Sequence, residues 1–360
     1  MKKATLVVLR PYQKNAIFDL QNPINGKDNH MFVFSELKKQ FEIVNYNLAT
    51  QDINSIEESE IVIYNDMPSR LPSRRVGQKL FLLAMESVSV APINFDISRY
   101  AYFDKVFTWH DLMIDNSRVF KINYSFLINP IPFLDFNNKK GFLCMVSGNK
   151  FSNHKGELYT ERFRFLEYIA SNNFISFDLF GTDWDVVYKT QSIYCLVKKF
   201  HYNKYLRKAW SVFEQFVFLL GLRFLIAKNY SFYRGRLSPK IPVLSNYKFN
   251  VCYENDGDTP GYITEKIFDC FFAGTVPVYL GAPNVCDYIP QNTFIDRRLF
   301  KNNNDLLEFL KNMPRDEYLS YQRNILNFLN SDAIRIFSSD YVANKIIVEV
   351  FASNHCLRKY

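Results

Sequence analysis

The residues from Tyr247 to Pro283 combine polar and charged side chains in a pattern that could bind a phosphorylated ligand. A helical pattern begins after Thr264, with Glu265 and Lys266 in its first turn. The free main-chain N–H groups at the start of a helix attract anions such as phosphate. A lysine there opposes the helix dipole at a cost of roughly 0.3–1 kcal/mol, which a nearby anion would reverse. The spacing leaves Lys266 open between a phosphate contact and an ion pair with Asp269.

The elements around these residues form a strand, a loop, a helix and a second strand. The pattern predicts a helix over 265–273, with Thr264 as its N-cap and Gly274 as its C-terminal stop. Apolar runs at 247–253 and 275–280 predict strands on both sides of this helix. Ligands of open α/β sheets bind beyond the carboxyl ends of the strands. This unit therefore presents its polar loop and helix start to a ligand.

Short apolar runs alternate with helical patterns along most of the chain. The runs that predict strands are 5–9, 61–64, 80–85, 105–109, 141–146, 175–180, 249–253 and 276–280. Helical spacing occurs at 162–170, 267–272 and 306–310. Uninterrupted apolar strands that alternate with helices are typical of parallel sheets covered on both faces. Because the pattern occurs on both sides of a polar stretch at 136–140, we predict an α/β fold with two Rossmann-like domains.

The composition permits two domains and narrows the function. The chain has 360 residues, of which 48% are hydrophobic, so large cores can form and wholesale disorder is excluded. A net charge of +8 attracts nucleic acid, an anionic membrane surface or phosphorylated small substrates. The sharply basic segment 198–208 is short and has no recognition motif beside it, which argues against nucleic-acid binding. The cysteines form no CxxC pair, so we expect reduced, buried thiols.

A basic and aromatic segment, Tyr194 to Tyr233, interrupts the alternating pattern. Its apolar run at 213–226 is shorter than the roughly 20 residues that span a bilayer, and it contains Arg223. We interpret this run as a buried core helix, and the alternative is a helix on an anionic membrane surface. The apolar run near Met1 is too short for a signal peptide. We therefore expect a cytoplasmic protein, with the inner face of the membrane as an alternative location.

The polar loop and its flanking elements closely resemble the signature of the α-1,3/4-fucosyltransferases, glycosyltransferase family 10. The matching segments are Lys248-Phe249-Asn250, Tyr253-Glu254-Asn255, 261–267 and 273–283. The resemblance is strong over roughly 140–185 and 233–297, moderate over 79–111, and absent over 1–60 and 190–232. It implies a GT-B type fold, in which two Rossmann-like domains face a cleft. It also implies GDP-L-fucose as the donor and an inverting transfer to a sugar hydroxyl.

The resemblance also implies roles for residues of the C-terminal half. It places Glu265 beside the fucose and Lys266 against the pyrophosphate, and it makes Asn255 and Tyr262 part of the donor pocket. The segment 145–149 is similar to the strand and loop that open the family's donor domain. This similarity places Ser147 and Asn149 in the donor site.

A second pyrophosphate contact in the family is an arginine at the start of the next helix. That position falls on Arg162, with Arg164 as a close alternative because the loop 150–161 is long. In the N-terminal half, the strand 80–85 ends at Glu86, which resembles the strand-end glutamate that the family uses as its general base. The alternative for Glu86 is an ordinary solvated carboxylate. With these roles, Glu86 would take the hydroxyl proton, and Arg162 and Lys266 would neutralise the leaving GDP.

Two short acidic motifs could hold a divalent metal against a diphosphate. These are Asp183-Trp184-Asp185 and Asp256-Gly257-Asp258. Because Arg162 and Lys266 can supply the same positive charge, we predict that no metal or other cofactor is obligatory. A stimulatory divalent metal remains an alternative.

We predict an acceptor-binding domain at 1–138 and a GDP-sugar-binding domain at 139–335, with a basic and aromatic insertion at 190–232. A C-terminal helix follows at 336–360. The partners we expect are GDP-L-fucose and a glycan acceptor, with transfer to O3 of GlcNAc in a glycan such as a lipopolysaccharide O-antigen. Two alternatives are a GT-B transferase that uses another nucleotide sugar and a non-catalytic basic protein that binds glycans or membranes.

Overall fold

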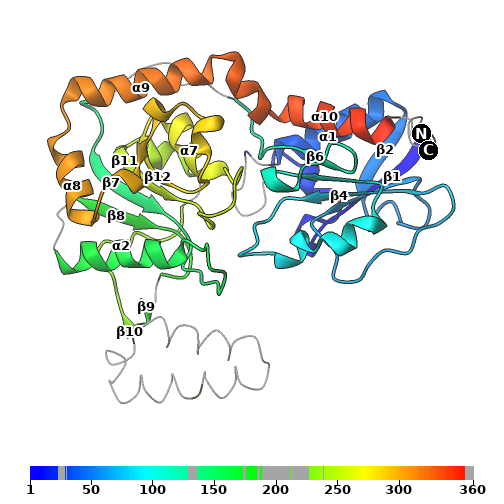
Figure 1. Ribbon diagram of the computed structural model, residues 1–360, viewed down its shortest axis with the longest axis horizontal. Coiled ribbons are helices and arrows are strands. Elements are labelled where there is room, and N and C mark those ends of the chain that lie inside the picture. Colours follow the sequence, from blue (N-terminus) through cyan, green and yellow to red (C-terminus); the bar gives the residue numbers. More distant parts are fainter. Residues whose placement is uncertain are drawn as a thin grey trace.

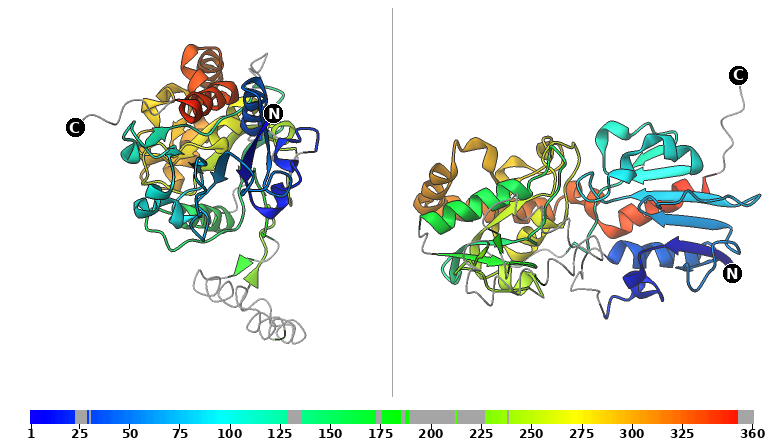
Figure 2. Two further views of the ribbon diagram at one scale, coloured as in Figure 1. Left: turned by 90° about the vertical axis from the view of Figure 1, so that its right-hand side faces the viewer. Right: turned by 90° about the horizontal axis from the view of Figure 1, so that it is seen from below.

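The computed structural model shows two α/β domains side by side along its longest axis (Figure 1 and the right panel of Figure 2). It describes residues 1–22, 29, 31–128, 136–172, 176–184, 187–188, 212, 227–237 and 239–352. Each domain is built on one parallel sheet. The predicted α/β architecture of the GT-B type is therefore confirmed.

The first domain holds a six-stranded parallel sheet with the order β2-β1-β3-β4-β5-β6. Its strands are β1 (Lys2–Val7), β2 (Tyr46–Thr50), β3 (Ile61–Asn65), β4 (Lys79–Ala84), β5 (Lys105–Thr108) and β6 (Val119–Lys121). Its helices are α1 (Phe32–Ile43) and the short 3-10 turns η1 (Arg10–Tyr12), η2 (Ala16–Phe18), η4 (Pro92–Phe95), η5 (Ile97–Tyr102) and η6 (Asp111–Met113). The buried runs of β3 and β4 explain why both strands were predictable, since they are apolar almost throughout.

The second domain holds a five-stranded parallel sheet with the order β13-β12-β11-β7-β8. Its strands are β7 (Gly141–Val146), β8 (Phe177–Phe180), β11 (Tyr247–Tyr253), β12 (Val276–Leu280) and β13 (Ile295–Asp296). The helices are α2 (Tyr159–Ser171), α6 (Ile241–Leu244), α7 (Glu265–Ala273), α8 (Asn303–Asn312) and α9 (Arg315–Leu329), with the 3-10 turns η7 (Val285–Asp287), η8 (Gln291–Thr293) and η9 (Arg297–Leu299). A separate two-stranded ladder pairs β9 (Val187–Tyr188) with β10 (Ala227–Lys228).

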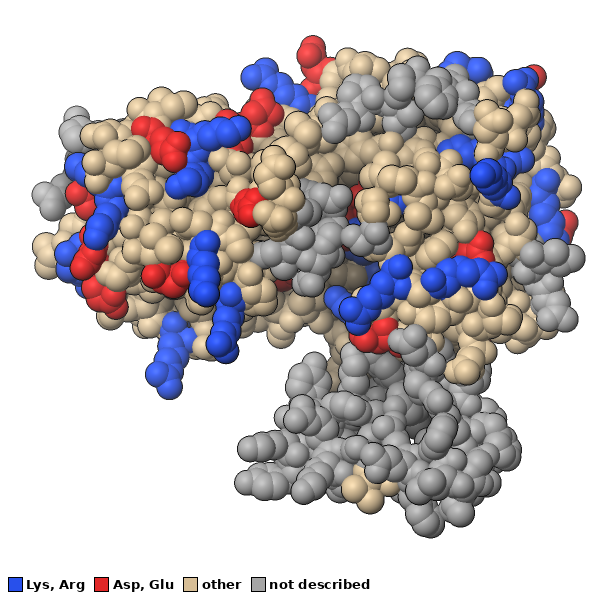
Figure 3. Space-filling model, turned by 180° about the vertical axis from the view of Figure 1, so that it is seen from behind, with Lys and Arg blue, Asp and Glu red and all other residues tan. Residues whose placement is uncertain are grey.

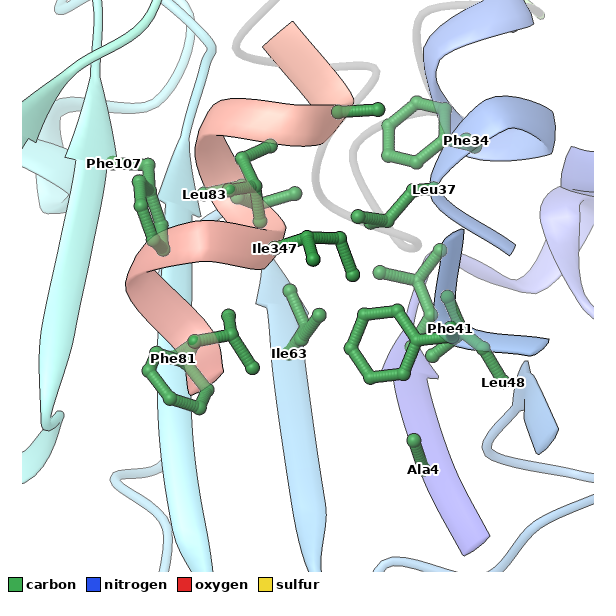
Figure 4. Close-up of a cluster of buried hydrophobic side chains, with 14 of the residues drawn as sticks. Ala4, Phe34, Leu37, Phe41, Leu48, Ile63, Phe81, Leu83, Phe107 and Ile347 are labelled. Carbon is green, nitrogen blue, oxygen red and sulfur yellow. The ribbon is translucent and has the colours of Figure 1, made fainter. Parts of the chain in front are cut away.

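After the second domain, the chain returns to the first one. The turn η10 (Asp332–Phe337) leads into α10 (Ser339–Phe351), which lies against α1 in the first domain (Figure 1). Ile347 of α10 points into the same apolar cluster as Leu37 of α1 and Leu48 of β2 (Figure 4). Lys105 of β5 donates to the Glu349 carboxylate at 2.5 Å, which adds an ion pair to this contact. The last helix is therefore part of the first domain's core.

Several segments were not predicted or lie outside the described residues. The apolar runs led to the strands β1, β3, β4, β5, β7, β8, β11 and β12, whereas β2, β6, β9, β10 and β13 were missed. Most of the basic and aromatic insertion at 190–232, and with it the core or membrane-surface helix, lies outside the described residues. Within the described part of the chain, no helix has both the length and the apolar character needed to cross a bilayer. The described Cys144, Cys252, Cys270 and Cys286 are free thiols, and the first three are buried.

The charged side chains on one face of the molecule are mixed in sign. On the face shown in Figure 3, lysine and arginine residues are spread over both domains, with aspartate and glutamate between them. Among the residues described on this face, the positive charge does not gather into a stripe of the kind that binds a nucleic-acid backbone.

Candidate active site

Glu86 lies two residues beyond the last residue of β4, at the carboxyl end of the first sheet. The carbonyl oxygen of the preceding residue, Met85, accepts hydrogen bonds from Trp109 Nε1 at 2.6 Å and from the Tyr124 hydroxyl. Trp109 directly follows β5 and Tyr124 lies three residues after β6, so the segments after two neighbouring strands fix the backbone next to Glu86. Burial is the main cause of the raised pKa of Tyr262 in the second domain, and the charge of Glu86 adds to it.

Tyr262 lies in the loop between β11 and α7 and is almost fully buried. Its ring lies 4.6 Å from that of Trp109 and 6.0 Å from that of Tyr124, measured between centroids. Asn255 Nδ2 donates to the Tyr262 hydroxyl at 3.3 Å. The aromatic residues that hold Met85 therefore also hold the loop of the second domain, and this contact brings Glu86 to the donor-site motif.

Gly261 allows this loop to approach the first domain. Its φ is +84°, in the left-handed region that side chains rarely adopt. A Cβ at this position would lie 2.4 Å from the Trp109 carbonyl oxygen and 2.8 Å from Asp111 Oδ2. The Gly261 N–H donates to Asn284 Oδ1 at 2.9 Å, and Asn284 Nδ2 donates to Asp111 Oδ2 at 2.8 Å. The two domains are thus joined by a hydrogen-bonded chain at the site.

Arg162, in the first turn of α2, is buried below the polar loop. Its Nη2 atom donates to the carbonyl oxygens of Tyr253 and Glu254, both at 2.6 Å, and to Asn255 Oδ1 at 2.9 Å. Its Nε atom is buried without a hydrogen-bond partner. Burial lowers the pKa of Arg162 from its ordinary value. A guanidinium with an unpaired N–H donor can bind an anionic ligand.

The alternative arginine lies elsewhere. Arg164 has a side chain that is 67% exposed, and it pairs with Glu161 on the surface of α2. Two helical residues further along, it points away from the face that carries Arg162. The structure therefore brings Arg162, and not Arg164, to Asn255.

Lys266 is held by two carboxylates. Its Nζ atom lies 3.0 Å from Glu254 Oε2 and 3.4 Å from Glu265 Oε1. Burial opposes the charged form, but these two neighbours raise the pKa of Lys266 above its ordinary value. The ion pair with Asp269 that the spacing permitted does not form, because Asp269 pairs with Lys240 at 2.9 Å. Glu254 supplies the nearby anion that offsets the unfavourable dipole.

The start of α7 differs in one detail from its sequence prediction. The helix runs from Glu265 to Ala273, and Gly274 stops it in the left-handed region at φ +62°, as predicted. Thr264 occupies the N-cap position, but its side chain makes no cap hydrogen bond. Instead, its main-chain N–H and its hydroxyl donate to the buried carboxylate of Glu254 at 2.8 and 2.6 Å. The prediction of a side-chain cap was wrong because Thr264 Oγ1 accepts from Lys266 Nζ at 2.9 Å instead of from a helix N–H.

Glu265 lies between two cations. Burial alone would raise the pKa of its carboxyl group, but Lys266 and Lys240 lower it below the ordinary value. Glu265 is therefore ionised at neutral pH. An ionised carboxylate at this helix start can stabilise a developing positive charge.

Ser147 and Asn149 follow β7, and both are hydrogen-bonded to residues that follow β8. The Ser147 carbonyl accepts from Trp184 Nε1 at 2.7 Å, and Asn149 Nδ2 donates to the Asp183 carbonyl at 2.9 Å. The Ser147 hydroxyl is buried and has no hydrogen-bond partner. Because β7 lies beside β11 in the sheet, both loops emerge at the same edge.

The acidic motif at 256–258 is used within its own loop. Asp256 is fully buried, and it accepts from the main-chain N–H groups of Asp258 and Thr259 and from the Thr259 hydroxyl. His154 Nε2 lies 3.3 Å from Asp256 Oδ2. The side chain of Asp258, in contrast, is exposed. In the other motif, Asp185 lies outside the described residues. Across the described part of the chain, no group of three or more His, Cys, Asp or Glu side chains could hold a metal ion.

The structure thus brings Arg162, Asn255 and Tyr262 into one hydrogen-bonded group, beside Lys266 and near Glu86. Sequence reasoning missed Glu254, which binds both Thr264 and Lys266. The available signal was its place directly after a buried strand, the same signal that singled out Glu86.

Two parallel α/β sheets that meet at a buried cluster of cations and carboxylates place the chain in the GT-B fold class. An α-glucosyltransferase in complex with UDP and DNA shares this fold, with a TM-score of 0.55 and 9% identity. The alignment covers 98% of this chain and 100% of that one. An α1,3-fucosyltransferase crystal structure has a TM-score of 0.50 and 17% identity, over 97% of this chain and 90% of that one. At such low identity, these likenesses show the fold alone.

The sequence comparisons match part of the chain to one family. Residues 231–327 match the model described as glycosyltransferase family 10 (fucosyltransferase) C-term. An α-(1,3)-fucosyltransferase of Helicobacter pylori is 38% identical over 93 residues, which are 25% of this chain and 19% of that protein. A mouse 4-galactosyl-N-acetylglucosaminide 3-α-L-fucosyltransferase is 40% identical over 85 residues, 22% of this chain and 23% of that protein. The matched segments thus span about a fifth of the length of these relatives.

Proposed function

We propose that this protein transfers L-fucose from GDP-L-fucose to a hydroxyl group of a glycan acceptor. The observation that carries the proposal is the match of residues 231–327 to a fucosyltransferase family, in the segment that holds Asn255, Tyr262 and Lys266. Relatives that match about a quarter of the chain are named as α-1,3- and α-1,4-fucosyltransferases. The cation cluster supports the proposal, because a nucleoside diphosphate leaving group requires positive charge.

In the mechanism that we propose, Glu86 is the general base that takes the proton of the acceptor hydroxyl as it attacks the anomeric carbon. Arg162, with its open Nε donor, and Lys266 stabilise the negative charge that develops on the departing GDP. Glu265 remains ionised and stabilises the oxocarbenium-like sugar in the transition state. Attack from the first domain and departure into the second would invert the anomeric configuration.

For the acceptor, we propose O3 of GlcNAc in a glycan such as a lipopolysaccharide O-antigen. This choice is supported by the named 3-α-L-fucosyltransferase among the relatives. We also propose a cytoplasmic protein that can associate with the inner face of the membrane, supported by the net charge of +8.

The direct experiment is an acceptor array with GDP-fucose, including N-acetyllactosamine and Lewis-type precursors. We expect transfer in the wild type and a loss of at least about 100-fold in kcat for Glu86→Gln, the range of a lost general base. Glu58→Gln is a matched control because Glu58 is an exposed carboxylate elsewhere in the same domain. Undiminished transfer by Glu86→Gln would rule out Glu86 as the base. Transfer from UDP-glucose alone would favour a transferase with another donor.

We propose that the reaction needs no obligatory metal, because Arg162 and Lys266 supply the positive charge. Activity should survive EDTA, with modest stimulation by a divalent metal as the alternative. Asp258→Asn tests the acidic motif better than a change at Asp256, whose side chain holds its own loop. Activity abolished by EDTA and by Asp258→Asn would show that a metal is required.

A further inference from the structure

The loop after β3 is hydrogen-bonded to the segment after β4, which contains Glu86. Asp66 directly follows β3, and its φ of +67° turns its side chain back toward β4. Its Oδ1 atom accepts from the Met85 N–H at 2.9 Å and from the Glu86 N–H at 3.0 Å. A single carboxylate oxygen thus fixes two successive peptide groups, one of which belongs to Glu86.

Asn94 completes this arrangement. It is fully buried, and its Nδ2 atom donates to Asp66 Oδ1 at 2.8 Å and to the Glu86 carbonyl oxygen at 3.2 Å. Its own Oδ1 atom accepts from the Met67 N–H at 2.7 Å. Both the N–H and the C=O of Glu86 are therefore bound by this pair of side chains.

Asp66 is energetically unfavourable in two respects, which indicates a role beyond ending the strand. Asp66 is largely surrounded by protein, and no lysine or arginine of the described residues forms an ion pair with it. Its negative charge is satisfied by N–H donors alone, and burial raises its pKa. A non-glycine residue in the left-handed region adds strain of about 1 kcal/mol or more. Such strained and costly positions cluster at functional sites.

We propose that Asp66 is a positioning residue that sets the direction of the Glu86 side chain through hydrogen bonds to its backbone. The inference rests on the proposed function, in which Glu86 is the general base. Asp66 touches neither substrate nor proton. It acts by preventing rotation of the Met85–Glu86 peptide, so that the carboxylate of Glu86 stays aimed at the acceptor hydroxyl.

The experiment compares Asp66→Ala with Asp66→Asn in the full-length protein, using GDP-fucose and the best acceptor of the array. Because a shift of about 1 Å in a catalytic group can cost about 100-fold, we expect Asp66→Ala to lower kcat by about 10- to 100-fold. The KM for GDP-fucose and the Kd for GDP should stay within about twofold of the wild type. Asp66→Asn keeps an oxygen acceptor at the same place and should retain at least about a third of the wild-type kcat.

Asp104→Ala is the matched control. Asp104 Oδ2 accepts from the Leu80 N–H at 2.7 Å, so it binds the amino end of β4 as Asp66 binds the carboxyl end. Asp104→Ala should lower Tm and leave kcat unchanged. A second test adds Asp66→Ala to Glu86→Ala. If Asp66 acts through Glu86, the double variant should be no slower than Glu86→Ala alone, because residues that act as a unit are not additive.

The results separate the inference from the function on which it rests. No transfer by the wild type to any acceptor would contradict the proposed function. With an active wild type, the inference is overturned if Asp66→Ala stays within threefold in kcat, if GDP binding weakens in parallel with kcat, or if Asp66→Asn is as slow as Asp66→Ala. If Asp66→Ala fails to fold, Asn94→Ala removes the second support of the Glu86 backbone. It should likewise lower kcat by about 10- to 100-fold with GDP binding unchanged, and a kcat within threefold of the wild type would overturn the inference.

Discussion

The buried pair of Glu254 and Lys266 should dominate the stability of the second domain. Glu254 is fully buried, and its Oε2 atom lies 3.0 Å from Lys266 Nζ. At that distance, two unit charges attract by about 5 kcal/mol with an effective dielectric constant of about 20. Removing Lys266 leaves Glu254 buried without its ion-pair partner, which costs about 3–5 kcal/mol, whereas removing Glu254 leaves Lys266 beside Glu265 at 3.4 Å and should cost less. Glu254→Gln retains an acceptor for Thr264 and removes the charge alone.

The assay is urea unfolding at pH 7, followed by circular dichroism and tryptophan fluorescence, on the wild type, Glu254→Gln, Lys266→Met and the double variant. We expect Lys266→Met to cost about 3–5 kcal/mol, or a Tm lower by roughly 6–20 °C, and Glu254→Gln to cost less because Glu265 still pairs with Lys266. The double variant should cost less than the sum of the two, with a coupling energy of about 2–3 kcal/mol.

The matched control is the surface pair Glu161 and Arg164 on α2, with the changes Glu161→Gln and Arg164→Met. Their coupling should stay below about 1 kcal/mol because solvent screens exposed pairs. The reasoning would be refuted if the costs of Glu254→Gln and Lys266→Met added within about 0.5 kcal/mol. It would also fail if the surface pair showed the larger coupling.

Three further predictions follow from the site. Gly261→Ala should lower Tm by several degrees more than Gly77→Ala. Both positions have positive φ, but of the two only Gly261 faces atoms of the other domain within 3 Å, so equal losses of Tm would contradict the close approach. Because the pKa of Glu265 is lowered from 4.5, its carboxylate contributes stability that is present above pH 4.5 and lost as pH falls; Tm measured against pH should therefore fall less below pH 4.5 in Glu265→Gln than in the wild type, and parallel curves would oppose this. Arg162→Lys should weaken GDP binding by at least about tenfold in calorimetry, whereas exposed Arg164→Lys should leave it unchanged; the reverse order would exchange their roles.

Most of the fold was predictable because parallel strands buried on both faces are apolar throughout. The segment Leu80–Ala84 is buried at every position and gives a continuous apolar signal. The edge strand β2 begins with half-buried Tyr46 and exposed Asn47, and β13 has only two residues, so neither gives such a signal. The place of α10 was not predictable from a local pattern. An apolar face on this helix predicts that it packs against something. It does not predict that the partner is the first sheet, whose residues lie far away in the sequence.

The site was predictable where a motif specified it and unpredictable where packing chose the partner. Arg162 and Asn255 were named from the family pattern, and the structure joins them by a hydrogen bond. The partner of Lys266 depends on the three-dimensional position of Glu254, which lies 12 residues earlier. Asp66 was missed because its contacts to Glu86 run across two strands, 20 residues apart in the sequence.

The return of the chain to the first domain has a consequence for synthesis on the ribosome. Residues 342–350 supply part of the apolar cluster that covers the first sheet, yet they are made after the whole second domain (Figure 4). The N-terminal half therefore emerges with this sheet face only partly covered, by α1, until α10 is made. Domains usually fold in the order in which they are made, and exposed apolar surface invites aggregation or chaperone binding. In this protein, the second domain can finish folding first, and the half made first is the last to be completed.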